Sequence, residues 1–218
     1  GSSGLTALTA RQDITSSGAI DGAEVRLEAG RDVNLTTQTS SSTGKNASRT
    51  SVDRVTGINA GQLLQVSAGR DITLAGAQVS GGGTLMLDAA RHLNQQTVNV
   101  AESIITLTAG QDLNARAAYV TSQGGAIGAA AGRDIAITNG VATSRFEESR
   151  YVENNSNGFS RKGSLLSSRT DSQRSTITHS AGNSMQVQGS TFSAEAVTMT
   201  AGRDLGVPDH GAMNWDEV

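Results

Sequence analysis

The chain has 218 residues, a formal net charge of −3 and no cysteine. So small a charge excludes a global electrostatic attraction to nucleic acid or to an acidic membrane, and we expect no nucleic-acid partner. The lack of cysteine excludes disulfides and thiolate metal ligands, and an aromatic content of only 3% leaves a core of small aliphatic side chains.

A tetrapeptide of the form Ala-Gly-Arg-Asp returns along the chain, in some copies with substitutions. Its second positions are residues 11, 30, 69, 90, 110, 132, 182 and 202, so the steps are 19, 39, 21, 20, 22, 50 and 20 residues. Five of these seven steps are one unit of about 20 residues, and the other two are one unit plus an insertion. A fixed period of this size predicts a stack of equivalent short units.

Within one unit, apolar and polar residues alternate over residues 25–29 and again over residues 33–35, on either side of a corner at residues 30–32. Such alternation predicts short strands with one side chain inside and the next outside. Several units add a third short strand after a small residue, as at residues 76–79. We therefore predict an all-β fold, a right-handed parallel β-helix (β-solenoid) of seven or eight coils of about 20 residues with two lateral insertions.

The corner residues are expected to stack from coil to coil. Glycine there suits either a positive φ or the close approach of the next coil, and aspartate accepts hydrogen bonds from turn amides. Interleaved arginines offset the repulsion between stacked aspartates, so we predict an exposed structural ladder of Gly30, Arg31, Asp32, Gly69, Arg70, Asp71, Gly110, Asp112, Gly132, Arg133, Asp134, Gly202, Arg203 and Asp204. A calcium-binding array is the alternative, but one aspartate per turn supplies too few ligands, and we expect no metal and no cofactor.

Two insertions, at about residues 38–58 and 141–179, are rich in Ser, Thr and Arg and lack the alternation. The second contains half of the aromatic residues, and the turn signal at residues 154–158 predicts a hairpin. Its mixture of basic and aromatic side chains suits anionic sugars or lipid headgroups. The candidate contact residues are Arg145, Phe146, Arg150, Tyr151, Phe159, Arg161, Lys162 and Arg169. A solvated excursion without a partner is the alternative.

The segments that follow the two insertions begin in the same way, with Ala60-Gly61 and with Ala181-Gly182. We align these two dipeptides, although Ala181 also aligns with Ala68. Residues 1–207 are thus predicted to form the repeat domain. Residues 208–218 hold the only proline and the only tryptophan and depart from the pattern, as a cap, a linker or an added end.

We find no catalytic motif in the chain. Its three histidines, His92, His179 and His210, lie in unrelated contexts and are expected to be structural, and no Gly-x-Ser-x-Gly motif is present. A β-helix that cleaves polysaccharides needs clustered carboxylates in a groove, whereas the recurring aspartate here occupies a repeated turn. We predict no enzymatic activity, no catalytic residue and no small-molecule substrate.

The units of the form Val-x-Leu-x-Ala-Gly-Arg-Asp-Val-x-Leu resemble the haemagglutinin repeats of the filamentous haemagglutinin family. Residues 158–187 add Gly-Phe-x-x-x-Gly-Ser, Ser-Ser-Arg-Thr and Thr-His-Ser-Ala-Gly, which are similar to the second haemagglutinin region of contact-dependent growth inhibition toxins. Together these motifs cover roughly residues 5–207.

The resemblance implies a rod segment of a very large exoprotein at the cell surface of a Gram-negative bacterium, exported by two-partner secretion. Its secretion partner would act through a domain outside this segment. The partner of the segment itself would be the outer membrane or a surface glycan of a target cell, in the delivery of a C-terminal toxin. An adhesin that binds surface glycan or lipopolysaccharide and a passive stalk are the alternatives, and the resemblance supplies no catalytic residues.

Overall fold

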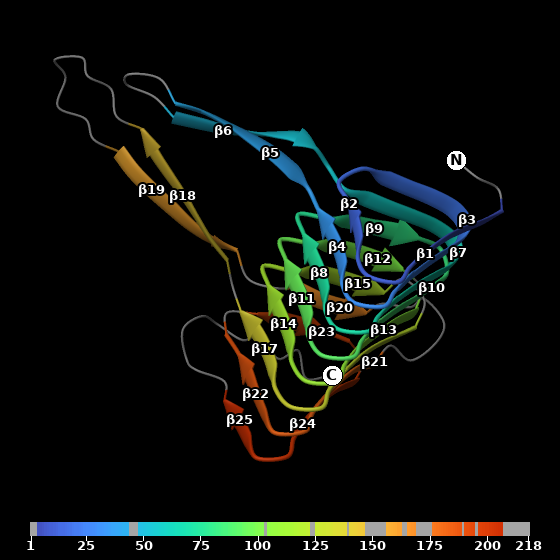
Figure 1. Ribbon diagram of the computed structural model, residues 1–218. Coiled ribbons are helices and arrows are strands. Elements are labelled where there is room, and N and C mark those ends of the chain that lie inside the picture. Colours follow the sequence, from blue (N-terminus) through green and yellow to red (C-terminus); the bar gives the residue numbers. More distant parts are fainter. Residues whose placement is uncertain are drawn as a thin grey trace, which may run out of the picture.

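The computed structural model describes residues 4–43, 48–102, 104–122, 125–138, 140–146, 156–162, 165–168, 176–188, 190–194 and 196–206. Within these ranges every regular element is a β-strand, and the strands wind into a parallel β-solenoid of about seven turns (Figure 1). The prediction of an all-β parallel solenoid is confirmed. In the same ranges no helix has the length and apolar character needed to span a membrane.

Each complete turn contains three strands, which we call first, second and third in chain order. The turn formed by β10 (Thr84–Ala89), β11 (Leu93–Gln96) and β12 (Asn99–Glu102) is representative. A corner at residues 90–92 joins its first strand to its second, and a shorter turn at residues 97–98 joins its second strand to its third.

The second strands form an eight-stranded parallel sheet on one face of the solenoid (Figure 1). In order they are β2 (Ile14–Ser16), β4 (Val33–Thr36), β8 (Ile72–Ala75), β11, β14 (Leu113–Arg116), β17 (Ile135–Thr138), β22 (Ser184–Val187) and β25 (Asp204–Gly206).

The first and third strands share a 13-stranded sheet. They are joined through β3 (Ala19–Ala29) and β7 (Gly57–Ala68), because each of these long strands is the third strand of one turn and the first strand of the next. The other first strands are β1 (Leu5–Ala10), β10, β13 (Ile104–Ala109), β16 (Ala126–Ala131), β21 (Thr176–Ala181) and β24 (Ala196–Ala201). The other third strands are β9 (Gln78–Gly81), β12, β15 (Tyr119–Ser122), β20 (Leu165–Ser168) and β23 (Thr191–Ser193).

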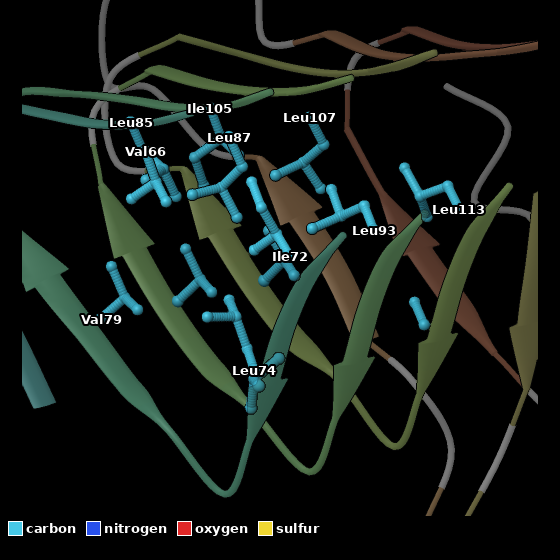
Figure 2. Close-up of a cluster of buried hydrophobic side chains, with 14 of the residues drawn as sticks. Val66, Ile72, Leu74, Val79, Leu85, Leu87, Leu93, Ile105, Leu107 and Leu113 are labelled. Atoms are coloured by element: carbon cyan, nitrogen blue, oxygen red, sulfur yellow. The ribbon is translucent and has the colours of Figure 1, made fainter. Parts of the chain in front are cut away.

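Aliphatic side chains of the same register stack along the interior. Val66, Leu87 and Leu107 occupy equivalent positions of β7, β10 and β13, and none is more than 2% exposed. Figure 2 shows them with Ile72 and Leu93 of the facing second strands, all pointing into the interior. Burial of each such side chain contributes about 1.5–3 kcal/mol, and every turn covers the core of its neighbour.

Two antiparallel hairpins interrupt the winding. They are β5 (Gln38–Thr43) with β6 (Ser48–Arg54), and β18 (Gly140–Phe146) with β19 (Ser156–Lys162). Each hairpin begins after a second strand, β4 or β17, and is followed by a third strand. Both hairpins therefore project from the same edge of the solenoid and to the same side (Figure 1).

The predicted bounds of the insertions, 38–58 and 141–179, are too wide. Gly57 and Ile58 already belong to β7, and β20 and β21 return to the solenoid sheet within the second range. The backbone of Leu166 pairs with that of Val120, and Ile177 pairs with Ile127 and is buried in the core. The alternation of apolar and polar residues is not recognisable in the sequences of β20 and β21, because each of these strands contains only one or two large apolar residues.

The alignment of Ala60 with Ala181 is also wrong. Ala181 pairs with Ala131, and the same column continues through Ala109 and Ala89 to Ala68. Ala60 pairs instead with a different column, because it lies within the continuous strand β7, which passes from the third position to the first without a corner.

Candidate functional site

The repeated corners lie directly above one another along the solenoid. The amide of Gly69 donates to the carbonyl of Ala29 at 2.9 Å, and the amide of Arg70 donates to the carbonyl of Arg31 at 2.8 Å. The same two hydrogen bonds recur at the following corners. The corner backbone is therefore a continuous part of the hydrogen-bonded stack.

Close contact between coils explains the corner glycines. A Cβ built at Gly69 would lie within 3.0 Å of the carbonyl oxygen of Gly30, and one built at Gly132 would meet the carbonyl of Gly110 in the same way. The only glycine of the described residues with a positive φ is Gly76, which lies in a different turn. Of the two explanations open from the sequence, close approach is the one that applies.

Arginine and aspartate link successive coils at these corners. The Arg70 guanidinium binds the Asp32 carboxylate of the preceding coil through both oxygens, with Nε 3.0 Å from Oδ1. The Asp71 amide also donates to Asp32 Oδ1, at 3.3 Å. The hydrogen bond from Arg70 is the main cause that holds the pKa of Asp32 below its ordinary value. Equivalent bidentate pairs join Arg31 to Asp13 and Arg133 to Asp112.

The pairs change where the tetrapeptide is substituted. His92 takes an aspartate position, and its Nδ1 lies 3.2 Å from Asp112 Oδ2 of the next coil. Asn183 replaces an arginine and donates from Nδ2 to Asp134 at 2.9 Å. At the last described corner, Arg203 lies 3.4 Å from Asp204 of its own coil, and both side chains are more than 70% exposed. The contacts of His92 and Asn183 still join successive coils, whereas the contact of Arg203 stays within its own coil.

The candidate contact residues of the second insertion fall into two groups. Arg145 and Phe146 lie on β18, while Phe159, Arg161 and Lys162 lie on β19. In the backbone register Arg161 is opposite Val141, and Phe159 is opposite Thr143. The remaining three, Arg150, Tyr151 and Arg169, lie outside the described residues.

A groove of about 980 Å³ lies at the foot of the first hairpin. Thr39 and Val55 of the hairpin stem line one end, and Tyr119 of β15 lines the other. Between them, the floor is formed by three successive turns that join second strands to third strands, at Gly76, Thr97 and Ala117. The second hairpin leaves the solenoid at the next turn, after β17.

The first hairpin is tied to this floor by one side chain. The Thr37 hydroxyl donates to the carbonyl of Gly76 at 2.7 Å and accepts from the amide of Thr56 at 3.0 Å. It thereby joins the outgoing chain, the returning chain and the next turn. The groove residues were not identified from the sequence, because its only hint is that both insertions leave at the same position of the repeat.

His179 lies in the core and belongs neither to the stacked corners nor to the groove. It is fully buried in β21, in register with Ala129 and Met199, and packs edge to face against Phe192 with ring centroids 5.6 Å apart. Neither ring nitrogen has a hydrogen-bond partner among the described residues. Burial lowers the pKa of His179 to about 4.

Comparison with known proteins identifies the repeat. Residues 2–103, which contain the strands from β1 to β12, match a family model described as Hemagglutinin repeat. No curated protein and no solved structure matches the chain. The match covers the first hairpin and the corners up to residue 92, and the resemblance of these repeats to hemagglutinin repeats is confirmed. Residues 2–103, slightly less than half of the chain, are therefore similar to hemagglutinin repeats, in agreement with the resemblance to the filamentous haemagglutinin family.

Proposed function

We propose that the chain is a non-enzymatic rod segment of a large bacterial surface exoprotein, which acts in contact with a target cell and in the delivery of a C-terminal toxin domain. The exoprotein is secreted to the cell surface of a Gram-negative bacterium by a two-partner route. Its partner is the outer membrane or a surface glycan of the target cell. The hemagglutinin-repeat family, a structural and adhesive class of secreted bacterial repeats, supports this proposal.

One structural observation carries the proposal. A regular solenoid of short turns is interrupted twice, and both interruptions are hairpins that leave the same edge and project to the same side (Figure 1). A passive stalk needs neither hairpin, because the short turn at Ala117 and Ala118 connects β14 to β15 at the equivalent place. Projecting loops on a rigid scaffold are the usual position of binding residues.

The test removes one hairpin without disturbing the winding. Residues 139–164 are replaced by Ala-Ala, the dipeptide that connects β14 to β15, in the full-length exoprotein of a producing cell. We expect producing cells to attach to target cells as before, while toxin entry is lost. A matched variant replaces residues 37–56 by Gly-Ala, the dipeptide between β8 and β9.

The same variants distinguish the alternatives. For an adhesin segment, the purified chain without residues 139–164 no longer binds target cells. For a passive stalk, neither attachment nor toxin entry changes in either variant. A far-ultraviolet circular dichroism spectrum that stays typical of β-structure shows that each shortened solenoid is folded.

A further inference from the structure

We propose that the groove at the foot of the β5–β6 hairpin binds a neutral oligosaccharide of a few sugar units. This inference deepens the proposed function, on which it rests, because it names the chemistry that this edge of the rod recognises on a cell surface. It assigns recognition to the groove and not to the basic and aromatic residues of the second hairpin.

Among the residues that the structure describes, no charged side chain lines the groove. Its polar members are threonines, amides and one phenol, among them Thr39, Gln78, Thr97, Asn99 and Tyr119. Hydroxyl and carboxamide groups donate and accept hydrogen bonds without a net charge, and they match the hydroxyl groups of a neutral sugar. A phosphate or carboxylate ligand would find no cation among the residues that line the groove.

Two exposed apolar side chains stand at the ends of the groove. Val55 is 44% exposed and Tyr119 is 45% exposed, whereas Val120, the next residue of β15, is buried. An aromatic ring with a polar hydroxyl offers a flat surface for the apolar face of a sugar and a partner for its hydroxyl groups. The concave, mostly apolar surface with a few placed polar groups has the character of a ligand site.

The polar positions repeat along the axis of the rod. Gln78, Asn99 and Tyr119 begin three successive third strands and are register partners of one another. Neighbouring strands lie about 4.8 Å apart, so the groove presents similar positions at regular intervals. A linear chain of similar units, such as an oligosaccharide, can use such positions in turn.

A peptide strand is a poor occupant of this groove. Strands β8, β11 and β14 on one wall and β9, β12 and β15 on the other are each paired on both sides. These six strands offer no open backbone edge for the addition of a further strand. On these walls recognition uses side chains, and the polar ones are hydroxyls and amides.

The backbone of the floor supplies a second and independent observation. Thr97 has φ of 52° and Ala117 has φ of 50°, a left-handed conformation that residues with a Cβ disfavour, and threonine strongly so. The equivalent turn at Gly76 has φ of 64° and carries glycine, which adopts this conformation freely. Strained backbone conformations are common at functional sites. Here the strained residues Thr97 and Ala117 each place a side chain on the floor of the groove, where glycine would have none.

The test uses the complete 218-residue chain and defined tetrasaccharides. Cellotetraose, chitotetraose and maltotetraose are the neutral probes, and tetragalacturonate is the anionic one. Titration calorimetry is expected to give saturable binding of at least one neutral probe. Tyr119→Thr, which keeps a strand-forming residue, should weaken this binding about tenfold, and Asn99→Ala about fivefold.

The matched control is Met86→Thr, because Met86 is 42% exposed on a first strand, away from the groove, and should bind like the wild type. The inference is overturned if no neutral probe binds, if tetragalacturonate binds most tightly, or if Tyr119→Thr has no effect. It is also overturned if sedimentation velocity shows dimers that Val55→Ser and Tyr119→Thr dissociate, since the groove then contacts a second copy. If sugars bind while the hairpin deletion leaves toxin entry unchanged, the proposed function fails and the groove assignment stands.

Discussion

At each corner the backbone of one coil lies directly on the backbone of the coil before it. A side chain at the glycine position has to push two coils apart, although the backbone conformation itself is one that any residue adopts. Gly69 is therefore constrained by its neighbour Gly30 and not by its own dihedral angles. Ala90 occupies the equivalent position in the next coil, where its amide still donates to Ala68 at 3.0 Å, so one methyl group can be accommodated.

We predict that Gly69→Ala lowers the free energy of unfolding by about 1–2 kcal/mol, since the new methyl group overpacks the corner. Gly18→Ala is the control, because a Cβ there meets nothing within 4 Å. Reduced freedom of the unfolded chain should leave that variant unchanged or more stable by about 0.4–1 kcal/mol. Urea unfolding measures both, and equal losses in the two variants would refute the packing explanation.

His179 predicts a dependence of stability on pH. Its pKa falls from 6.5 to about 4 on folding, so between these values the unfolded chain binds a proton that the folded chain does not. Stability therefore decreases as the pH falls from 6.5 towards 4, by up to about 3 kcal/mol for this group. Above pH 6.5 both states are neutral and the group has no effect.

His179→Leu is expected to remove this part of the acid sensitivity, because leucine is the residue at the same register in β10 and β13. Thermal unfolding of both proteins at pH 7.5 and pH 4.5 provides the measurement. The gap in melting temperature between variant and wild type should widen at the lower pH. A gap of the same size at both pH values would contradict the prediction.

At the scale of the elements, the sequence predicts some features of this fold better than others. The alternation identified the strands around Val25, Leu87 and Leu107, because inward positions there are large and aliphatic. It failed around Leu166 and His179, where a strand of four to six residues has few large apolar positions. The join within β7 was missed because no corner marks it.

The contacts of the stacked corners and the groove could be predicted from the sequence only in part. A period of about 20 residues predicts that corners stack, but it does not say whether Arg70 reaches the preceding or the following aspartate. That choice depends on the direction of the side chain in three dimensions. The groove depends on Val55 and Tyr119, 64 residues apart in the chain (119 − 55), and on left-handed turns at residues other than glycine, which no propensity predicts.

At the scale of the whole molecule, the repeat predicts that coils are exchangeable units. Ala89 and Ala109 are register partners, so removal of residues 90–109 joins β10 to the corner at Gly110 with one complete turn omitted. We expect this variant to fold, with the denaturant dependence of its unfolding free energy reduced by roughly a tenth, in proportion to the surface lost.

Removal of residues 90–99 omits half a period and is the control. It removes the corner and β11 and joins a first strand directly to a third strand, so that the buried residues Ala89 and Val100 become neighbours in the chain, and this variant should fail to form the solenoid. Circular dichroism and urea unfolding compare the two deletions. If both fold, or if neither does, the coils are not independent units of this kind.

The hydrogen bonds between coils, and the pairs such as Arg70 with Asp32, all run along the long axis of the rod. A pull on the two ends therefore opens one interface between turns at a time instead of sliding many strands past each other. Under tension the segment should yield stepwise, turn by turn, and lengthen by the chain released at each step. A tether between two moving cells would in this way respond to a sudden load by unfolding turns and becoming longer, before its attachment to either cell breaks.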